Sequence, residues 1–222
     1  TLNGHTSGVV TATLSTTAID NLDNLNGTGN AYTITVADTQ VTAAALNSVN
    51  AATSLNVTAS AVTKITGSLS DLATTYTANN GITGLGNEAI VVSDANITFT
   101  EANTVNGYTT GVVTATISTT AIDDLDDLDV SGNAYTITVG TAQVTAAALN
   151  TVNAATTVDV TATAVTQITG SAAELATAYG GGMTLGNDLT LVLTDTSLAA
   201  ATLTPTVNGY STTIINPTSL TE

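Results

Sequence analysis

Oxygen-bearing side chains recur at alternate positions in one short acidic segment. Asp127, Asp129 and Ser131 are separated by single apolar residues, and a glycine follows at the sixth position. This pattern matches the opening of an EF-hand loop, in which such oxygens bind Ca²⁺. The match ends at the twelfth position, where Thr138 stands in place of the expected bidentate glutamate. We therefore predict Asp127, Asp129 and Ser131 as candidate calcium ligands, with a solvated, charged turn as the alternative.

The chain offers little to nucleophilic or acid–base catalysis. His5 is its one histidine, and the equivalent position in the second half holds Tyr108. A catalytic nucleophile needs an activating partner, and no such motif lies beside His5. Paired carboxylates could cleave a glycosidic bond only in a groove that also holds the sugar, which one lysine and 3% aromatic residues poorly supply. We predict no enzyme activity, no catalytic residues and no cofactor other than a calcium ion.

The charge balance restricts the partners. Seventeen acidic residues face one basic residue, Lys64, which gives a formal net charge of −16. Binding to nucleic acid requires Lys and Arg to neutralise phosphate, and anionic membrane surfaces have the same requirement. No apolar run is long enough to cross a bilayer, so membrane insertion is not expected. The absence of cysteine excludes a disulfide framework.

Two copies of one long segment make up most of the chain. Ala-Tyr-Thr-Ile-Thr-Val at 31–36 returns at 134–139, and Asn3-Gly4 returns at 106–107 and again at 208–209. We place the two large repeats at 3–105 and 106–207, with a partial further repeat at 208–222. Self-similarity of this kind is typical of solenoids, in which each repeat contacts its neighbours. The chain is therefore predicted to be a single continuous solenoid over 1–222.

Each large repeat contains four shorter ones, which we call rungs. A rung reads as a short alternating strand, a turn and a short helix, with strands at 10–13, 34–36, 57–59 and 90–92 and helices at 17–25, 41–49, 68–76 and 97–105. The second copy repeats this order from Val113, and a ninth rung begins at 213–215. We predict a repeat solenoid of about eight rungs, β-helix or leucine-rich-repeat-like, with a parallel sheet on one face and helices on the other. The predicted inward positions are Ile34, Val36, Leu46, Val57, Ile137, Val139 and Leu149.

The helix starts and the corners carry local signals. Ser or Thr followed three residues later by an acid is the signature of a capping box, and it occurs at Thr17, Ser68, Thr120 and Ser171. Gly and Asn cluster between rungs, where they suit tight turns with positive φ, and matching asparagines are expected to form a hydrogen-bonded ladder. Much of the acidic content is thus assigned to helix N-termini.

Two stretches, residues 160–179 and 81–95, carry a resemblance to known proteins. Both resemble the Thr/Ala/Asp-rich repeats of very large exported proteins of cyanobacteria and other marine bacteria, often labelled haemolysin-type calcium-binding or adhesin-like. The resemblance covers essentially the whole chain and implies an extracellular or cell-surface fibre, with no catalytic residue to transfer. The hallmark nonapeptide Gly-Gly-x-Gly-x-Asp of that family does not occur, so calcium binding does not follow from the resemblance.

The two ends of the sequence read as two halves of one rung. Placing the last residues before the first gives Thr-Glu-Thr-Leu-Asn-Gly, which is close to residues 100–107. Open strand edges invite a further copy to stack, and a head-to-tail contact that does not close forms a filament. We predict self-association head to tail, or continuation into flanking repeats of a longer polypeptide, through Thr1, Leu2, Asn3, Gly4, Ile214, Ile215, Leu220 and Glu222.

These observations predict a structural, non-enzymatic unit of an extracellular filament, sheath or adhesin stalk. The alternatives are a calcium-stabilised adhesin and a binding module for glycan or ice. Thr-x-Thr pairs recur on several strands, as an ice-binding array would require, but they lapse at 90–92 and 191–193. An interrupted array favours the structural interpretation.

Overall fold

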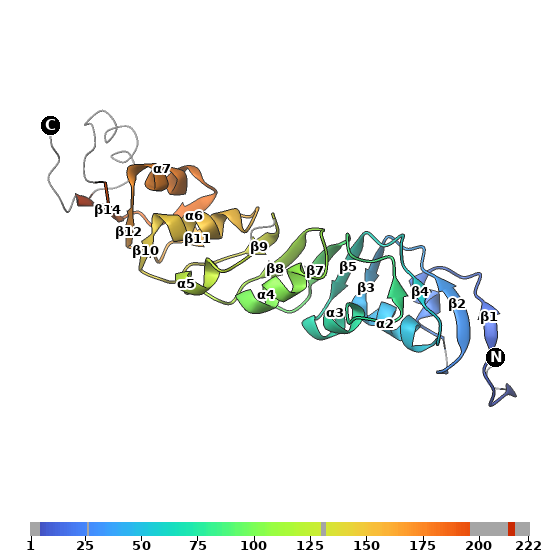
Figure 1. Ribbon diagram of the computed structural model, residues 1–222. Helices are drawn as coiled ribbons and strands as arrows, with labels where there is room; N and C mark the ends of the chain where they lie inside the picture. Colours follow the sequence, from blue (N-terminus) through green and yellow to red (C-terminus); the bar gives the residue numbers. More distant parts are fainter. Residues whose placement is uncertain (1–4, 26, 130–131, 196–212, 216–222) are drawn as a thin grey trace. The chain divides into compact units, whose positions relative to one another are not determined.

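The computed structural model describes residues 5–25, 27–129 and 132–195 and the backbone of 213–215 (Figure 1). The chain divides into two compact units, which we describe separately: unit 1 is Thr1–Ala95 with Thr104–Ala115, and unit 2 is Asn96–Asn103 with Thr116–Glu222. Several predicted site residues lie outside the described residues: Thr1, Leu2, Asn3, Gly4, Ser131, Leu220 and Glu222.

Unit 1 alternates short strands with short helices. Its elements in chain order are β1 (Thr11–Thr13), α1 (Ile19–Leu22), β2 (Ala31–Thr35), β3 (Gln40–Thr42), α2 (Ala43–Ala51), β4 (Val57–Thr58), β5 (Lys64–Gly67), α3 (Leu69–Thr75), β6 (Ile82–Thr83), β7 (Ala89–Val92), the end of α4 (Phe99–Asn106) and most of β8 (Val113–Thr116). The strands form two parallel sets, in the orders β1-β2-β4-β6 and β3-β5-β7-β8. Helices α2 and α3 lie side by side along β3 and β5 (Figure 1).

Unit 2 repeats this plan. After the start of α4 it contains α5 (Ile122–Leu125), β9 (Ala134–Thr136), β10 (Gln143–Thr145), α6 (Ala146–Ala154), β11 (Val160–Ala162), β12 (Gln167–Gly170), α7 (Ala172–Gly180), β13 (Met183–Leu185), β14 (Thr190–Leu193) and β15 (Thr213–Ile215). Its strand orders are β10-β12-β14-β15 and β11-β13. Parallel bridges join Asn133 to Thr156 and Thr138 to Thr161, which places β9 beside β11. None of the described helices has the length and apolar character needed to cross a membrane.

The strands pair in parallel, as the sequence predicted, although the predicted strands 57–59 and 90–92 of successive rungs lie in different sheets. Ile34 lies beside Val57, which lies beside Ile82 in turn. The strand predicted at 213–215 is β15, and Ile214 pairs with Leu191 of β14 in the way that Val113 pairs with Ile90 of β7. Each unit is therefore an α/β fold built from small parallel sheets.

The prediction of one sheet was wrong. Residues of one rung enter two small sheets rather than one, since β2 and β3 lie in different sheets, as do β4 and β5. Val41, which was predicted to begin a helix, lies in β3, and the helix begins two residues later at Ala43. The reason is that Gln40-Val41-Thr42 pairs in parallel with Lys64-Ile65-Thr66 of β5, and Thr42 then caps α2.

The predicted inward positions form the core. All seven are buried, from Ile34 in β2 to Leu149 in α6, and none is more than 1% exposed. Leu46 and Val49 mark the buried face of α2, as their spacing of three predicted. Leu25 was expected to continue α1, but α1 ends at Leu22 and the Leu25 side chain is partly exposed. The corner glycines behave as predicted, for example Gly84 and Gly86 with φ of 89° and 124°.

Candidate functional site

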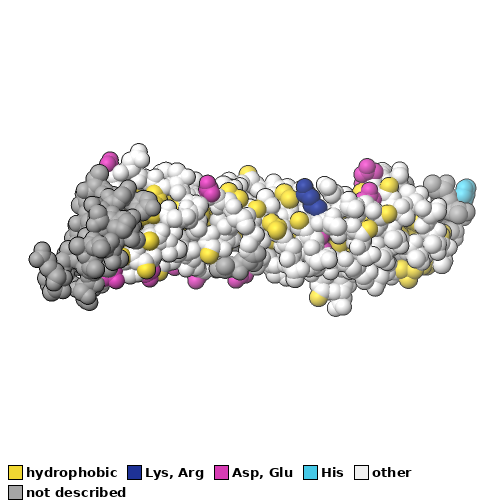
Figure 2. Space-filling view, turned by 90° about the horizontal axis from the view of Figure 1, so that it is seen from above, with side chains coloured by type: hydrophobic (Ala, Val, Ile, Leu, Met, Phe, Trp, Pro, Cys, Tyr) yellow, Lys and Arg dark blue, Asp and Glu magenta, His cyan; other side chains and the backbone are white. Residues whose placement is uncertain are grey.

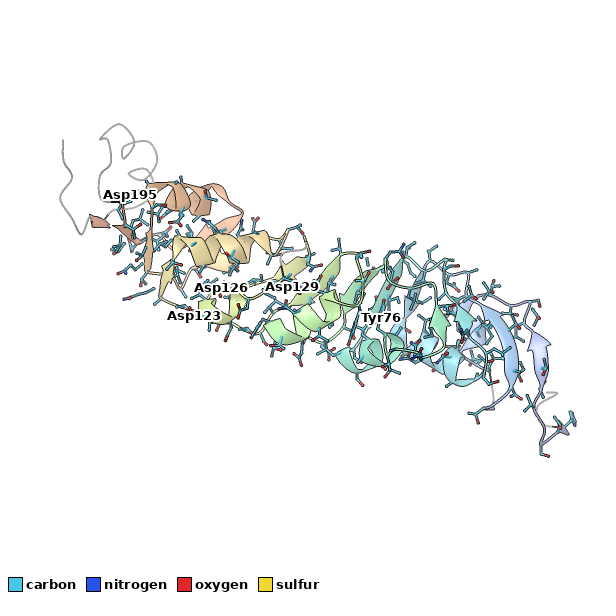
Figure 3. All side chains as sticks on the ribbon, in the orientation of Figure 1. Tyr76, Asp123, Asp126, Asp129 and Asp195 are labelled. Carbon is cyan, nitrogen blue, oxygen red and sulfur yellow. The ribbon has the colours of Figure 1, made fainter. Side chains whose placement is uncertain are left out.

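The predicted calcium segment lies in unit 2, directly after α5. Figure 3 shows Asp123 on α5, Asp126 directly after its end and Asp129 in the segment that follows. The side chain of Asn103 brackets this segment: its Nδ2 donates to the carbonyl of Asp127 at 2.8 Å, and its Oδ1 accepts from the amide of Asp129 at 2.9 Å. Within the described residues no three His, Cys, Asp or Glu side chains gather to hold a metal ion. Calcium binding by Asp127, Asp129 and Ser131 stays a prediction.

Asp129 also acts on a buried tyrosine. The Tyr135 hydroxyl accepts from Asn133 Nδ2 at 2.9 Å, and Tyr135 is fully buried. Burial is the main cause that raises the pKa of Tyr135 from 10 to about 12, and the negative charge of Asp129 adds to it. Tyr179 has its pKa raised to about 12 by burial. Unit 2 thus contains two phenols that keep their protons to unusually high pH.

The raised pKa values of Tyr135 and Tyr179 predict that the protein loses stability at alkaline pH. Between pH 10 and 12 the unfolded phenol loses its proton while the folded phenol keeps it, so rising pH favours unfolding across that window. We expect the Tm to fall steeply from pH 10 to 12, and to fall less in Tyr135→Phe than in the parent chain. Circular dichroism melts at several pH values measure this. Equal slopes for the two proteins would contradict it.

Five helices have their first amide bound by a side chain of the following rung. The Ile19 amide donates to Asp38, the Leu69 amide to Asp94 and the Ala172 amide to Asp195, each at 2.7 Å. Threonine hydroxyls take this role for α4 and α5, where the Phe99 amide donates to Thr119 at 3.2 Å and the Ile122 amide to Thr141 at 2.9 Å. A helix N-terminus leaves such amides without an intrahelical partner, so each of these bonds joins two rungs while it completes a helix.

Of the four capping boxes predicted from sequence, one is complete, one is half formed and two are absent. Ser171 and Glu174 form a complete box, and Ser68 accepts from the amide of Asp71 at 3.1 Å. Thr17 and Thr120 do not cap, because α1 and α5 begin one residue later, after Ala18 and Ala121, and take their cap from the next rung. An unpredicted pair, Thr98 and Glu101, exchanges capping bonds at the start of α4. The Glu174 carboxyl has its pKa lowered, chiefly by hydrogen bonds from Ser171.

Because Asp94 caps α3 from the next rung, substitutions of Asp94 are expected to lower the free energy of unfolding. Asp94→Ala removes the acceptor for the Leu69 amide and is expected to cost about 1 kcal/mol of unfolding free energy. Asp94→Asn keeps an oxygen at the same place and should retain most of that stability. Urea denaturation of the two variants measures the difference. Equal losses in both would show that the charge of Asp94, rather than its acceptor oxygen, stabilises α3.

Threonine hydroxyls form a second set of bridges between rungs. Thr53 Oγ1 donates to the carbonyl of Tyr32 at 2.8 Å and accepts from its amide at 2.9 Å. Thr156 does the same for Tyr135, at 2.7 and 2.9 Å. Asparagine amides form a third set, since Asn47 and Asn150 donate across to the carbonyls of Asp71 and Glu174, both at 3.0 Å. The abundance of Thr and Asn is thus explained in part by contacts between successive rungs.

A buried carboxyl group holds one corner of unit 1. Glu88 is fully buried; its Oε2 accepts from the amides of Gly86 at 2.8 Å and Asn87 at 3.1 Å, and its Oε1 accepts from the hydroxyl of Tyr76. Thr109 of the next rung donates to the carbonyl of Glu88 at 2.6 Å. Burial and the Glu88 carboxyl together raise the pKa of Tyr76. Its ring stacks on Tyr108 with centroids 4.9 Å apart (Figure 3 labels Tyr76).

One shallow concavity occurs at the same place in both units. In unit 1 it has a volume of about 300 Å³ and is lined by Ile19 and Asp20 of α1, Gln40 and Thr42 of β3 and Thr66 of β5, among others. In unit 2 its volume is also about 300 Å³, and the matching residues are Ile122, Asp123, Gln143, Thr145 and Thr169. Carboxylate, amide and hydroxyl groups therefore meet around an apolar floor in each unit, with a second carboxylate, Asp23, in unit 1 and a second amide, Gln167, in unit 2.

Sequence reasoning missed Glu88, the caps from the next rung and the two concavities. The caps had a readable signal, because each lies two positions after the last buried residue of a strand segment, as in Val36-Ala37-Asp38 and Val92-Ser93-Asp94. The predicted interface residues Ile214 and Ile215 lie in β15, beside Leu191 and Val192. His5 is exposed.

Comparison of the chain with protein-family models, with curated proteins and with solved structures finds no match.

Proposed function

We propose that this chain is a structural, non-enzymatic repeat unit of an extracellular filament, sheath or adhesin stalk. The observation that carries the proposal is the use of polar side chains to join successive rungs. Buried Thr156 and Thr109, together with Thr53 and Asp94, bind backbone groups of a neighbouring rung. Such contacts add to parallel strand pairing and resist separation of the rungs, as a spacer requires.

The proposal includes one continuous solenoid of about eight rungs and association head to tail. It is supported by β15, which docks on β14 in the register that β8 uses on β7. A third large repeat would thus begin on the second in the way that the second begins on the first. The next copy belongs either to a separate molecule or to the same, longer polypeptide.

Light scattering and electron microscopy of the purified 222-residue chain over a range of concentrations test this assembly. We expect filaments whose fibre diffraction shows a meridional spacing of about 4.8 Å, the distance between paired strands. A chain that stays monomeric at high concentration would exclude head-to-tail assembly and leave the longer-polypeptide alternative. Antibody labelling of intact producing cells tests the proposed surface location, and an exclusively internal signal would contradict it.

The calcium-stabilised alternative is tested on the same material. A calcium site at Asp127 and Asp129 would raise the Tm on addition of CaCl₂, and Asp129→Asn would abolish that rise. An unchanged Tm in the parent chain would remove calcium from the proposal.

A second candidate, ice binding, is favoured by one observation. Exposed threonines lie in register across three strands in each unit: Thr35, Thr58 and Thr83 in unit 1, and Thr138, Thr161 and Thr184 in unit 2. The lapses at 90–92 and 191–193 fall in β7 and β14, which lie in other sheets. The hydroxyls therefore repeat without interruption at about 4.8 Å.

An ice-recrystallisation assay tests this candidate. Thr58→Tyr and Thr161→Tyr together should abolish any inhibition, whereas Ser70→Tyr, an exposed position on α3, should not. Absence of inhibition by the parent chain would remove ice from consideration.

A further inference from the structure

We propose that the concavity between α1 and β3, and its counterpart between α5 and β10, is a binding site for neutral carbohydrate. Each unit then holds one site, built around Asp20 and Gln40 in unit 1 and around Asp123 and Gln143 in unit 2. This inference adds a recognition role to the chain and does not depend on its assembly into filaments.

The two copies differ at exposed positions around the concavity and agree in most of its lining. Exposed positions around the concavity differ between them: Asn21 corresponds to Asp124, Asn24 to Asp127 and Thr39 to Ala142. Seven of the eight lining residues correspond, among them Asp20, Gln40 and Thr66 with Asp123, Gln143 and Thr169, whereas Asp23 lines only the concavity of unit 1 and Gln167 only that of unit 2.

Structure explains part of this identity but not all of it. Ile19 and Ile122 are buried, and Thr42 and Thr145 cap the helices α2 and α6. Gln40 and Gln143, in contrast, are exposed side chains at the start of a strand. Asp20 and Asp123 lie in the first turn of a helix, where a carboxylate is favourable, yet the adjacent first-turn position varies between Asn21 and Asp124. A ligand common to both sites gives these exposed residues a reason to be retained.

The lining also offers the kinds of chemical group that bind a sugar. A carboxylate accepts two hydroxyl hydrogen bonds, an amide both donates and accepts, and a threonine hydroxyl does either. In unit 1 these groups surround the apolar side chains of Val41 and Ala45. A sugar presents the complementary surface, with hydroxyls at its edge and C–H groups on its face, and sites of mixed lining suit such ligands.

The charge of the chain selects neutral sugars. The net charge of −16 and the carboxylate in each site oppose uronates and sulfated sugars. Figure 2 shows one face of the molecule, on which acidic side chains are scattered among uncharged polar atoms and one basic side chain. A shallow site binds a single ligand with low affinity. Because the chain has two such sites, a polysaccharide that occupies both is bound with a higher apparent affinity.

The two sites differ in two lining residues, Asp23 in unit 1 and Gln167 in unit 2, and the second of these lets an experiment tell the sites apart. Gln143 pairs in register with Gln167, which lines the concavity of unit 2, whereas Gln40 pairs with Lys64. The side-chain amide signal of Gln167 therefore reports on unit 2 alone.

The test uses the 222-residue chain and neutral oligosaccharides, namely gluco-, manno- and galacto-oligosaccharides, with a uronate oligosaccharide as the charged comparison. NMR titration follows the side-chain amides of Gln40, Gln143 and Gln167 in the parent chain, Asp20→Ala, Asp123→Ala and the double variant. We expect each single variant to lose the shifts at its own site and the double variant to bind at least about tenfold more weakly. Asn21→Ala and Asp124→Ala, on the same helices but outside the lining, serve as matched controls and should bind like the parent.

Three results would overturn the inference. These are no shift of the glutamine amides with any neutral oligosaccharide, parental binding by a double variant whose melt is unchanged, and stronger binding of the uronate. Each of them leaves the proposed structural role intact, because filament formation is measured without a sugar.

Discussion

Replacing Glu88 by alanine is expected to lower the free energy of unfolding by about 3 kcal/mol. The substitution removes the fully buried carboxyl group that accepts from the partly buried amides of Gly86 and Asn87 and from the Tyr76 hydroxyl. A buried donor that loses its acceptor costs the full desolvation of the group, which is why the effect exceeds that of a surface substitution. Urea denaturation followed by circular dichroism gives the value.

Two companion variants make the Glu88 result interpretable. Glu88→Gln keeps one carbonyl oxygen for the backbone amides and an NH₂ group that can donate to the Tyr76 oxygen, so it should cost about 1 kcal/mol. Asp188→Ala, an exposed carboxylate in the equivalent corner of the second copy, should change stability by less than about 0.5 kcal/mol. A Glu88→Ala protein as stable as Asp188→Ala would show that water replaces the lost acceptor.

The second large effect is expected at Gly111, where alanine should cost about 3 kcal/mol. A Cβ at this position would lie 2.6 Å from the carbonyl carbon of Glu88 and 2.9 Å from the carbonyl oxygen of Asn87, and closer still to the Glu88 oxygen. These neighbours are backbone atoms, so neither can swing aside as a flexible side chain would. The two rungs must separate locally to admit one methyl group.

Gly180→Ala is the matched control for Gly111→Ala. Gly180 ends α7 and has no atom within 4 Å of an added Cβ, and alanine has the higher helix propensity. It should therefore leave stability unchanged or raise it by up to about 1 kcal/mol. Thermal melts of both variants decide the matter, and equal stability of the two would mean that the contact between Gly111 and Glu88 relaxes without cost.

Glu88 and Gly111 lie in one corner, so their effects should not add. Gly111→Ala displaces the segment that Glu88 already holds through its carboxyl group. The double variant Glu88→Ala with Gly111→Ala is expected to lose less stability than the sum of the two single losses, because residues in direct contact share part of each loss.

The sequence by itself determined the internal repeats, the parallel direction of the strands and the inward positions. These depend on local periodicity: alternation in Ile34-Thr35-Val36 gives a strand with one buried face, and the spacing of Leu46 and Val49 gives a helix with one. A duplicated sequence also gives a duplicated structure. Once Ile34 and Leu46 were predicted to face inward, Ile137 and Leu149 could be predicted to face inward as well. Ser171 and Glu174 were equally readable, since a capping box lies within four residues.

Only the tertiary structure decided which groups meet across rungs. Asp94 caps a helix that begins 25 residues earlier, and Thr109 reaches a carbonyl 21 residues earlier, so no short window of sequence contains both partners. The same holds for the two sheets, because a three-residue strand such as Gln40–Thr42 is too short to show its period and is fixed by its neighbour Lys64–Gly67. Glu88 is the clearest case. An acidic residue beside Gly and Asn is typical of a solvated turn, whereas Glu88 is buried because Tyr76 and Thr109, which belong to other rungs, contact it.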